Sequence, residues 1–373
     1  MKYDYLVIGA GLSGAVFSNI VASHGKTVLV VDRKPSVGGA CETYTEEGIT
    51  VHKYGPHIFH TNNCHVWNYV RQFGEFKNFI NSPIAIFNEE AYNLPFNMNT
   101  FSKVFGVTTP EDAKRKIEED KSRVHIESPM NLEEQAMKMV GPTIYNMFIK
   151  EYTEKQWGKP CTELSPDIIK RLPLRFTYDN NYFNDSYQGI PIDGYSSIIS
   201  KMLDNKNITL KLNYDYIGIN DELNSIATKI IYTGRIDEFF NYKYGKLEYR
   251  GLDFSTFTYR IDNFCGNAVV NYTSADVPYT RITEHKYFLN EASNKTIISY
   301  EYPCDATNVP EKSYYPIETK SNIDLYNKYK DEARSNHNLV ITGRLGLYKY
   351  YNMDKIVELA VDLAMSELKG DKE

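Results

Sequence analysis

Three glycines near the start of the chain, Gly9, Gly11 and Gly14, have the spacing of a phosphate-binding turn. They follow an apolar run over residues 5–8, which predicts a buried parallel strand. Gly9 permits a tight turn, Gly11 lets a pyrophosphate approach the backbone, and Gly14 lets the next helix pack closely on the strand. The free N–H groups and partial positive charge at the start of that helix would attract the phosphates.

Asp32 ends a second apolar run, residues 27–31, at the distance expected for a carboxylate that binds a ribose. Strand, glycine turn, helix, second strand and acidic end come in order, so the motif predicts a dinucleotide site; the alternative is a glycine-rich turn without a ligand. Arg33 and the pair Gly38-Gly39 then resemble flavin-binding oxidases and their relatives more than NAD dehydrogenases. Since a second tight turn would bring backbone N–H groups towards a flavin, the segment favours FAD over NAD.

Size and composition narrow the class of protein. The chain has 373 residues, a net charge of −6 and a sequence pI near 5.8, which allows two or three lobes and argues against a nucleic-acid partner. We expect no membrane span, because no apolar run is long enough, and no signal peptide, because the first strand begins at once. The five cysteines have no metal-ligand spacing and predict reduced thiols in a cytoplasmic protein: Cys41, Cys64, Cys161, Cys265 and Cys304.

The rest of the chain must position this site. Thr109-Pro110 predicts a helix start with Pro at the first helical position. Short runs rich in Tyr, Thr, Val and Phe predict an antiparallel sheet, and later apolar runs predict strands and an amphipathic helix that return to the nucleotide domain. The expected sheet strands are residues 256–261, 268–272 and 296–300, and the returning elements are 226–233, 339–344 and the helix 355–368.

The predicted fold class is therefore α/β: an FAD-binding Rossmann-like domain with an interleaved helical lobe and an antiparallel β-sheet lobe. The expected FAD-binding domain is discontinuous, covering residues 1–75 plus about 185–240 and 320–373. The helical lobe is expected over about 100–175, and the sheet lobe over about 76–99 and 241–319.

Four further segments carry a resemblance to a known family. They are residues 52–61 (HKYGPHIFHT), 152–158 (YTEKQWG) running on to 171–176 and 180–183, 271–281 (NYTSADVPYTR), and 314–316 with 343–351. Together with the glycine motif they resemble the bacterial UDP-galactopyranose mutases. The resemblance covers essentially the whole chain, and the motifs are long and come in order.

The resemblance implies an isomerase that interconverts UDP-galactopyranose and UDP-galactofuranose without net redox change and supplies a furanose donor for cell-surface glycan synthesis. In this family FAD is active when reduced. Its N5 attacks the anomeric carbon, UDP leaves, and a flavin–sugar iminium forms while the sugar opens and recloses. The implied partners are a UDP-sugar and a reductant such as NAD(P)H, and the implied assembly is a homodimer.

The resemblance also assigns roles to residues. Arg171 and Arg281 would stabilise the diphosphate as UDP leaves, and His57 would lie beside the flavin. For each the alternative is a structural role, an ion pair for the arginines or a hydrogen-bonded core residue for the histidine. The implied substrate-binding residues are Asn81, Phe148, Tyr152, Thr153, Trp157, Tyr182, Asn271, Tyr315, Tyr350 and His60, and the implied cofactor-binding residues are Gly9, Gly11, Ser13, Gly14, Asp32, Arg33, Gly38, Gly39, His57, Arg344 and Met353; no metal site is expected.

Two departures from the family pattern leave alternatives open. Asn352 stands where many relatives have Asp, and Gly346-Leu347 stands where relatives often have Ala-Glu. They put the sugar in doubt more than the reaction, so a mutase for a 6-deoxy or N-acetylated sugar, or for one on another nucleotide, is one alternative. A flavin oxidase or dehydrogenase and a non-catalytic nucleotide-sugar sensor are the others.

Overall fold

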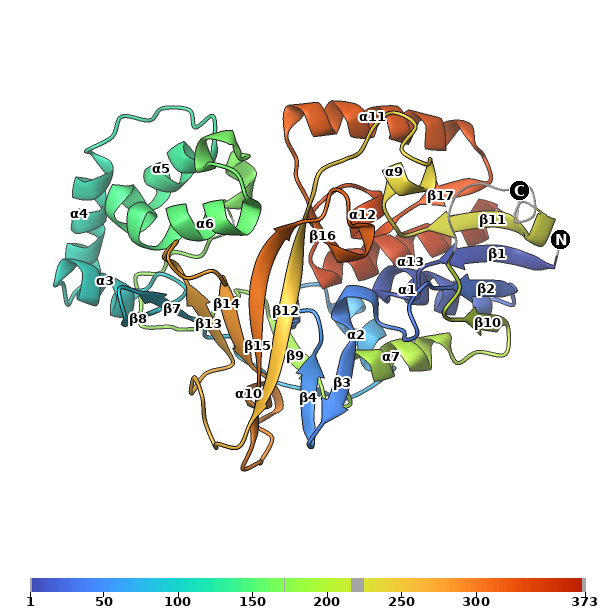
Figure 1. The fold of residues 1–373 in the computed structure, drawn as a ribbon, viewed down its shortest axis with the longest axis horizontal. Coiled ribbons are helices and arrows are strands. Elements are labelled where there is room, and N and C mark those ends of the chain that lie inside the picture. Colours follow the sequence, from blue (N-terminus) through green and yellow to red (C-terminus); the bar gives the residue numbers. More distant parts are fainter. Residues whose placement is uncertain (1, 171, 216–224, 371–373) are drawn as a thin grey trace.

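A five-stranded parallel sheet, with the order β10-β2-β1-β11-β17, organises the first lobe of the computed structural model, which describes residues 2–170, 172–215 and 225–370 (Figure 1). Alternate strand residues face opposite cores, so Val7 and Val30 join one cluster while Leu6 and Leu29 join the other. Both faces of this sheet are covered, which is why its central strands are largely apolar. The strands are β1 Tyr3–Ile8, β2 Val28–Val31, β10 Ile208–Lys211, β11 Ala227–Tyr232 and β17 Leu339–Ile341.

The turn after β1 has the conformation that the glycine motif predicted. Gly9 has φ +114°, which favours glycine, and a Cβ on Gly14 would lie 2.0 Å from the Gly9 carbonyl oxygen. The turn leads through Gly11 into the first helix. Helices cover the two faces of the sheet: α1 Leu12–Ser23, α2 Cys64–Arg71, α7 Gly194–Leu203 and α13 Met353–Gly370 on one, and α9 Ile236–Phe239, α11 Lys320–Ser335 and α12 Gly343–Gly346 on the other.

A seven-stranded sheet, with the order β16-β12-β15-β14-β13-β7-β8, forms the second lobe. All neighbours are antiparallel except β13 and β7. The strand expected over 256–261 is longer and starts earlier, because pairing with β15 and β16 carries β12 through the strand-poor residues Gly251 and Asp253. Its strands are β7 Ile84–Phe87, β8 Glu90–Asn93, β12 Tyr249–Tyr259, β13 Val269–Tyr272, β14 Arg281–Glu284, β15 Thr296–Asp305 and β16 Ser313–Pro316.

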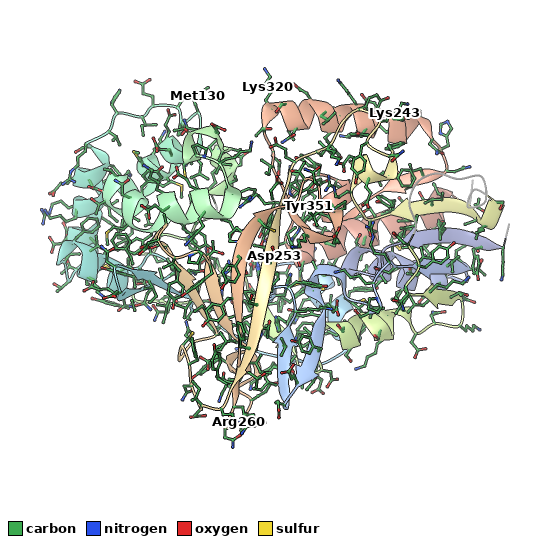
Figure 2. The ribbon with its side chains drawn as sticks, viewed as in Figure 1. Met130, Lys243, Asp253, Arg260, Lys320 and Tyr351 are labelled. Carbon is green, nitrogen blue, oxygen red and sulfur yellow. The ribbon has the colours of Figure 1, made fainter. Side chains whose placement is uncertain are left out.

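Figure 2 shows Arg260 at the tip of this sheet, far from Met130 in the helical lobe at the upper left. The helical lobe caps the β7–β8 end of the sheet (Figure 1). Thr109 is the N-cap that the sequence predicted, since its hydroxyl accepts the N–H of Asp112 at 3.2 Å. The lobe contains α3 Met98–Phe105, α4 Pro110–Lys121, α5 Leu132–Ile144, the π-helix η2 Tyr145–Ile149 and α6 Lys150–Trp157.

Short elements connect the lobes near the middle of the molecule. A three-stranded sheet joins β5, β9 and β6, and a hairpin joins β3 and β4. Their bounds are β3 Thr43–Glu46, β4 Ile49–His52, β5 Phe59–Thr61, β6 Phe76–Lys77 and β9 Tyr187–Pro191, and the short helices are η1 Gly39–Cys41, η3 Cys161–Glu163, η4 Pro166–Ile168, α10 Lys286–Leu289 and η5 Pro310–Lys312.

One buried arginine joins the two large sheets. Arg235 follows β11, is 1% exposed, and forms a bidentate pair with Asp237 at 3.1 and 2.7 Å. The same guanidinium donates to the carbonyl oxygens of Leu247 and Ala306, which flank β12 and β15. The fold class expected from the sequence is confirmed, and the lobes are interleaved as predicted, while the domain boundaries stay a prediction. Among the described residues no helix combines the length and apolarity that a membrane crossing needs.

Candidate functional site

A cavity of about 740 Å³ lies between the lobes. Residues from α6, from the seven-stranded sheet and from the segment after β4 line it. Every substrate-binding residue that the sequence suggested is on its wall, and so are four other predicted residues. These wall residues are Asn81, Phe148, Tyr152, Thr153, Trp157, Tyr182, Asn271, Tyr315, Tyr350 and His60, together with Arg281, His57, Arg344 and Met353.

The remaining predicted residues lie elsewhere. The turn residues of the nucleotide motif surround the start of α1 and do not line the cavity: Gly9, Gly11, Ser13, Gly14, Asp32, Arg33, Gly38 and Gly39. Arg171 lies outside the described residues. The structure thus separates a nucleotide turn at the parallel sheet from a larger chamber between the lobes.

The nucleotide turn is formed by two glycine segments that meet. Gly11 pairs with Gly38, and a Cβ on Gly11 would lie 3.5 Å from the Gly39 Cα. Because the N-cap is a glycine without a capping side chain, the first-turn amides of α1 are free to bind phosphate. Asp32 braces the turn, since its carboxylate accepts the N–H of Ala10 at 2.7 Å.

Arg33 pairs with Glu238 through two 3.0 Å hydrogen bonds. That bidentate pair gives Arg33 a structural partner in α9. The cradle fits a dinucleotide, because glycines, free amides and a carboxylate occupy the positions that such a ligand needs.

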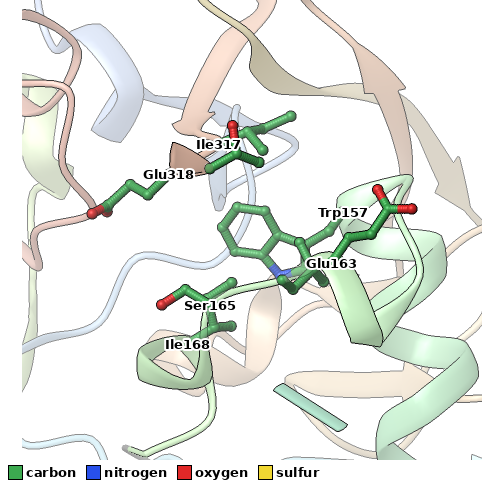
Figure 3. Close-up of a pocket in the computed structure, with 8 residues that line it drawn as sticks. Trp157, Glu163, Ser165, Ile168, Ile317 and Glu318 are labelled. Carbon is green, nitrogen blue, oxygen red and sulfur yellow. The ribbon is translucent and has the colours of Figure 1, made fainter. Parts of the chain in front are cut away.

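The first wall of the cavity is aromatic, and we call it the helix wall: Phe148 from η2 with Tyr152 and Trp157 from α6. Phe148 is only 4% exposed and packs edge-on against Tyr92 at 4.8 Å, so its ring is largely core. Figure 3 shows the Trp157 indole between Ser165 and Ile168 on one side and Ile317 and Glu318 on the other.

The opposite wall carries charge, and we call it the sheet wall: Asn271 on β13, Arg281 on β14 and Glu301 on β15. Strand register places Arg281 opposite both of the others. Its guanidinium donates to Asn271 Oδ1 at 3.2 Å and lies 3.6 Å from Glu301 Oε2. Burial raises the pKa of Glu301 and Arg281 opposes that shift. Glu301 was not predicted, because its role depends on strand pairing.

The two walls meet where Arg281 Nη2 donates to the Tyr152 hydroxyl at 3.3 Å. Lys155 makes a second link between the two walls, which we call the Lys155 clamp. The Lys155 ammonium lies 2.8–3.0 Å from four carbonyl oxygens at the end of β13 and in the β13–β14 connection, those of Tyr272, Ser274, Val277 and Tyr279, and its three N–H groups are shared among them. Desolvation by burial lowers the pKa of Lys155 to about 8. Contacts between Lys155 and main-chain carbonyl oxygens therefore fix the helix wall relative to the sheet wall. These contacts were not predicted from the sequence.

Tyrosine hydroxyls and one more guanidinium complete the chamber. Burial raises the pKa of Tyr182 to about 12, so it remains a hydroxyl donor at neutral pH. Tyr315 and Tyr350 have ring centroids 5.5 Å apart, and the Arg344 guanidinium lies 5.0 Å from the Tyr350 ring. Arg344 is itself oriented by the Tyr351 carbonyl, which accepts from Nη2 at 2.7 Å.

Each of the two predicted histidines, His57 and His60, is held by a hydrogen bond at its own Nδ1. His57 Nδ1 lies 2.9 Å from the Gly55 carbonyl oxygen, so this nitrogen carries the proton and Nε2 is an acceptor. Burial lowers the pKa of His57 to about 4, and the charges of Arg344 and Arg281 add to that effect. His60 Nδ1 lies 2.5 Å from Asp185 Oδ2, and its ring stacks on Phe183 at 3.7 Å.

Both departures from the family pattern have a place in the structure. Asn352 lies on the cavity wall beside Met353. Gly346 has a packing reason, because a Cβ there would lie 2.8 Å from Ile341 Cγ2 and 3.2 Å from the Gly234 carbonyl oxygen. All five cysteines are free, and no cluster of metal-binding side chains occurs in the ranges that the structure describes.

Comparison with known proteins identifies relatives along the whole chain. The family described as UDP-galactopyranose mutase matches residues 147–350, and the NAD(P)-binding Rossmann-like domain matches residues 7–73. A probable UDP-galactopyranose mutase from Klebsiella pneumoniae is 41% identical over 97% of this chain and 94% of its own length. A dTDP-fucopyranose mutase from Escherichia coli is 36% identical over 99% of both chains.

A solved structure has the same fold. The crystal structure of a reduced UDP-galactopyranose mutase aligns with a TM-score of 0.78, at 16% identity, over 100% of this chain and 95% of that one. At this identity the likeness concerns the fold alone, and it includes both sheets and the helical lobe.

Proposed function

We infer, from the UDP-galactopyranose mutase family to which this chain belongs, that the protein is an isomerase that interconverts UDP-galactopyranose and UDP-galactofuranose. One observation supports this most directly. The cavity sets a guanidinium, Arg281, against an aromatic wall that contains Tyr152 and Trp157. A base that stacks, a diphosphate that needs a fixed positive charge and a sugar with several hydroxyls would each find suitable groups there.

The cofactor is FAD, as the sequence predicted. The glycine cradle at α1 would hold its pyrophosphate, and Arg344 and His57 would lie near the flavin ring in the cavity. When bound and reduced, FAD would supply a nucleophilic nitrogen for the reaction at the anomeric carbon.

The side chains of the protein bind the substrate and stabilise the charge that develops on it. Tyr152 stacks with uracil, and Tyr182, Tyr315 and Tyr350 donate hydroxyl hydrogen bonds to the diphosphate. Arg281 stabilises the negative charge that grows as UDP leaves, and holds UDP for its return. Arg171 is the second such arginine.

His57 acts as a neutral group. Its proton is committed to the Gly55 carbonyl oxygen, so it offers the Nε2 lone pair to the cavity. Burial lowers the pKa of His57 and so keeps it neutral at neutral pH, and the charges of Arg344 and Arg281 act in the same direction. His60, oriented by Asp185, contacts the sugar.

Asn352 lies on the cavity wall and stands where many relatives have Asp, so we propose it as the residue to test for the choice of sugar. We propose UDP-galactose as the best substrate. A relative described as a dTDP-fucopyranose mutase makes a 6-deoxy sugar on a thymidine nucleotide the specific alternative. NAD(P)H as the reductant, a homodimer and a cytoplasmic location are also part of the proposal.

A redox-balanced assay tests the reaction. The purified protein, reduced with dithionite under anaerobic conditions, is incubated with UDP-galactofuranose, and chromatography measures UDP-galactopyranose. We expect product with no reductant consumed per turnover, because the oxidation level of the sugar does not change. One reducing equivalent per product would instead indicate an oxidoreductase, and binding without turnover would indicate a sensor.

A further inference from the structure

Two buried histidines lie directly behind His57 without lining the cavity. His52 ends β4 and is 1% exposed, and His285 lies between β14 and α10 and is 0% exposed. Neither has a role in the reaction described above. The ring of His52 is enclosed, with Phe288 stacked on its face at 4.5 Å and Tyr195 against its edge at 5.9 Å.

Successive hydrogen bonds link His57 to His52, His52 to His285, and His285 to the seven-stranded sheet. The His57 main-chain N–H donates to His52 Nδ1 at 3.1 Å, and the His52 main-chain N–H donates to His285 Nδ1 at 3.2 Å. His285 Nε2 lies 2.7 Å from Ser299 Oγ, which lies 2.8 Å from Thr256 Oγ1.

These contacts determine where the protons are. Each Nδ1 accepts a main-chain N–H, so neither carries a hydrogen, and each neutral ring is protonated at Nε2. His285 Nε2–H therefore donates to the Ser299 hydroxyl, which also shares a hydrogen bond with the Thr256 hydroxyl. A proton on either Nδ1 would clash with the hydrogen of the main-chain N–H group that this nitrogen accepts.

The hydrogen bonds from His57 to His52 and from His52 to His285 hold a segment that contains a tight turn at Gly55. Gly55 has φ +87°, and a Cβ there would lie 3.0 Å from Glu301 Oε2. The turn thus passes between Glu301 of the sheet wall and His52 beneath it. The Gly55 carbonyl oxygen in turn receives His57 Nδ1–H, so the position of the main chain decides which nitrogen of His57 faces the cavity.

We propose that His52, supported by His285, is a positioning residue that holds the His57 main chain and thereby sets the tautomer that His57 presents to the flavin site. The part that concerns the flavin rests on the proposed function, whereas the tautomer is a property of the protein itself. Burial lowers the pKa values of His52 and His285, which keeps both acceptors unprotonated at neutral pH.

Two substitutions at one position separate positioning from packing. Asn at position 52 can place its amide oxygen near the site of Nδ1, while Leu fills similar space without an acceptor. We expect His52→Leu to lower kcat/KM about tenfold, the loss that follows when a buried N–H loses its acceptor. It should also shift the midpoint potential and the visible absorption of the bound flavin, and His52→Asn should restore most of each.

The tautomer of His57 is read directly. Nitrogen-15 NMR of the histidine-labelled protein, in which there are eight histidines, should show His57 protonated at Nδ1 in the wild type and in His52→Asn, and a mixture of tautomers in His52→Leu. This measurement needs no turnover. If the wild type fails as a mutase while the NMR pattern holds, the proposed reaction is wrong and the positioning role stands.

The proposal is overturned if Asn and Leu at position 52 give the same flavin potential, or if His57 keeps a single tautomer in His52→Leu. Urea unfolding checks that each variant is folded under the assay conditions. If His52→Leu does not fold, Ser299→Ala replaces it, since it removes the far acceptor of the chain. We expect a smaller shift in the same direction, and no shift would contradict the proposal.

Discussion

The sheet wall and the helix wall of the cavity hold their functional groups in different ways. On the sheet wall, Arg281 is partly buried on β14 and takes its position from register with Asn271 and Glu301. On the helix wall, Tyr152 and Trp157 extend from one helix and are aligned by the Lys155 clamp. A rigid, partly buried charge suits electrostatic stabilisation of a transition state, and an aromatic surface suits ground-state binding. The comparison predicts that sheet-wall variants lower kcat and helix-wall variants raise KM.

The largest effect should come from Arg281→Ala. Loss of a preorganised donor to developing negative charge costs about 3–4 kcal/mol, roughly a hundred- to a thousandfold in kcat. Arg281→Lys should not recover full activity, because an ammonium cannot reproduce the guanidinium fork. Steady-state kinetics with FAD content as the control measures both. Arg171→Ala should behave alike, and near-normal kcat/KM in both alanine variants would reject the diphosphate assignment.

Acid should weaken the fold through the histidines beside the sheet wall. His285 has a pKa of about 3 in the fold against about 6.5 when unfolded, so the unfolded chain binds more protons between these values. Stability is therefore complete above pH 6.5 and falls as pH decreases towards 3, by about 1.4 kcal/mol per pH unit for such a histidine, or about 3 kcal/mol over two units.

Urea unfolding at pH 6.5, 5.5 and 4.5 measures this slope. His285→Gln should reduce it by the share of one histidine, and His125→Gln should leave it unchanged, because the His125 side chain is 92% exposed. Burial raises the pKa values of Glu291 and Glu301, which acts in the opposite direction, so the difference between variants is the test. An unchanged slope in His285→Gln would contradict the assignment.

Tyr152→Ala should change binding more than chemistry. Removing an aromatic platform for a base costs about 2 kcal/mol, so KM should rise roughly thirtyfold while kcat changes little. Tyr152→Phe keeps the ring and removes only the hydroxyl that Arg281 contacts. If alanine lowered kcat and left KM unaltered, the division of labour between the walls would be wrong.

Lys155→Met should loosen the joint between the walls. The ammonium serves four carbonyl oxygens, and its loss should reduce the free energy of unfolding by about 1.5 kcal/mol, the scale of a hydrogen bond to a charged group. Both kcat and KM should worsen, since both walls shift. Lys155→Arg retains the charge and is the matched control; equal stability of the methionine variant and the wild type would show that the clamp contributes nothing.

The smallest effect should be that of Asn352→Asp, which restores the family carboxylate. If Asn352 tunes sugar choice, the ratio of kcat/KM for UDP-galactose to that for dTDP-fucose should move by about 1 kcal/mol, or roughly fivefold. If residue 352 only supports Tyr350, both substrates change together. A constant ratio in wild type and variant would remove Asn352 from the specificity argument.

The parts that sequence could predict are those in which local pattern and chemistry coincide. The turn at Gly9 and Gly14, the helix start at Thr109-Pro110 and the parallel strands depend on neighbours in the chain, and the structure confirms them. Family motifs also brought the cavity residues together, although Phe148 proves largely core.

Other residues became visible only through tertiary pairing. Glu301 faces Arg281 because of strand register, and Asp185 meets His60 across 125 positions of sequence. Lys155 and His52 act on main-chain groups, which carry no signature in the sequence. Positions whose partners are backbone atoms therefore escape a reading based on residue types.

The buried Arg235 has a consequence for how the molecule comes apart. Its guanidinium is shared between Asp237 beside the parallel sheet and carbonyl oxygens that flank the antiparallel sheet. Separating the sheets would break the hydrogen bonds to the Ala306 and Leu247 carbonyl oxygens while the Arg235–Asp237 pair stays, and leaving buried donors unpaired is costly. The two sheets should melt as one cooperative unit, with native-state hydrogen exchange in β11 and β12 reporting the same opening free energy.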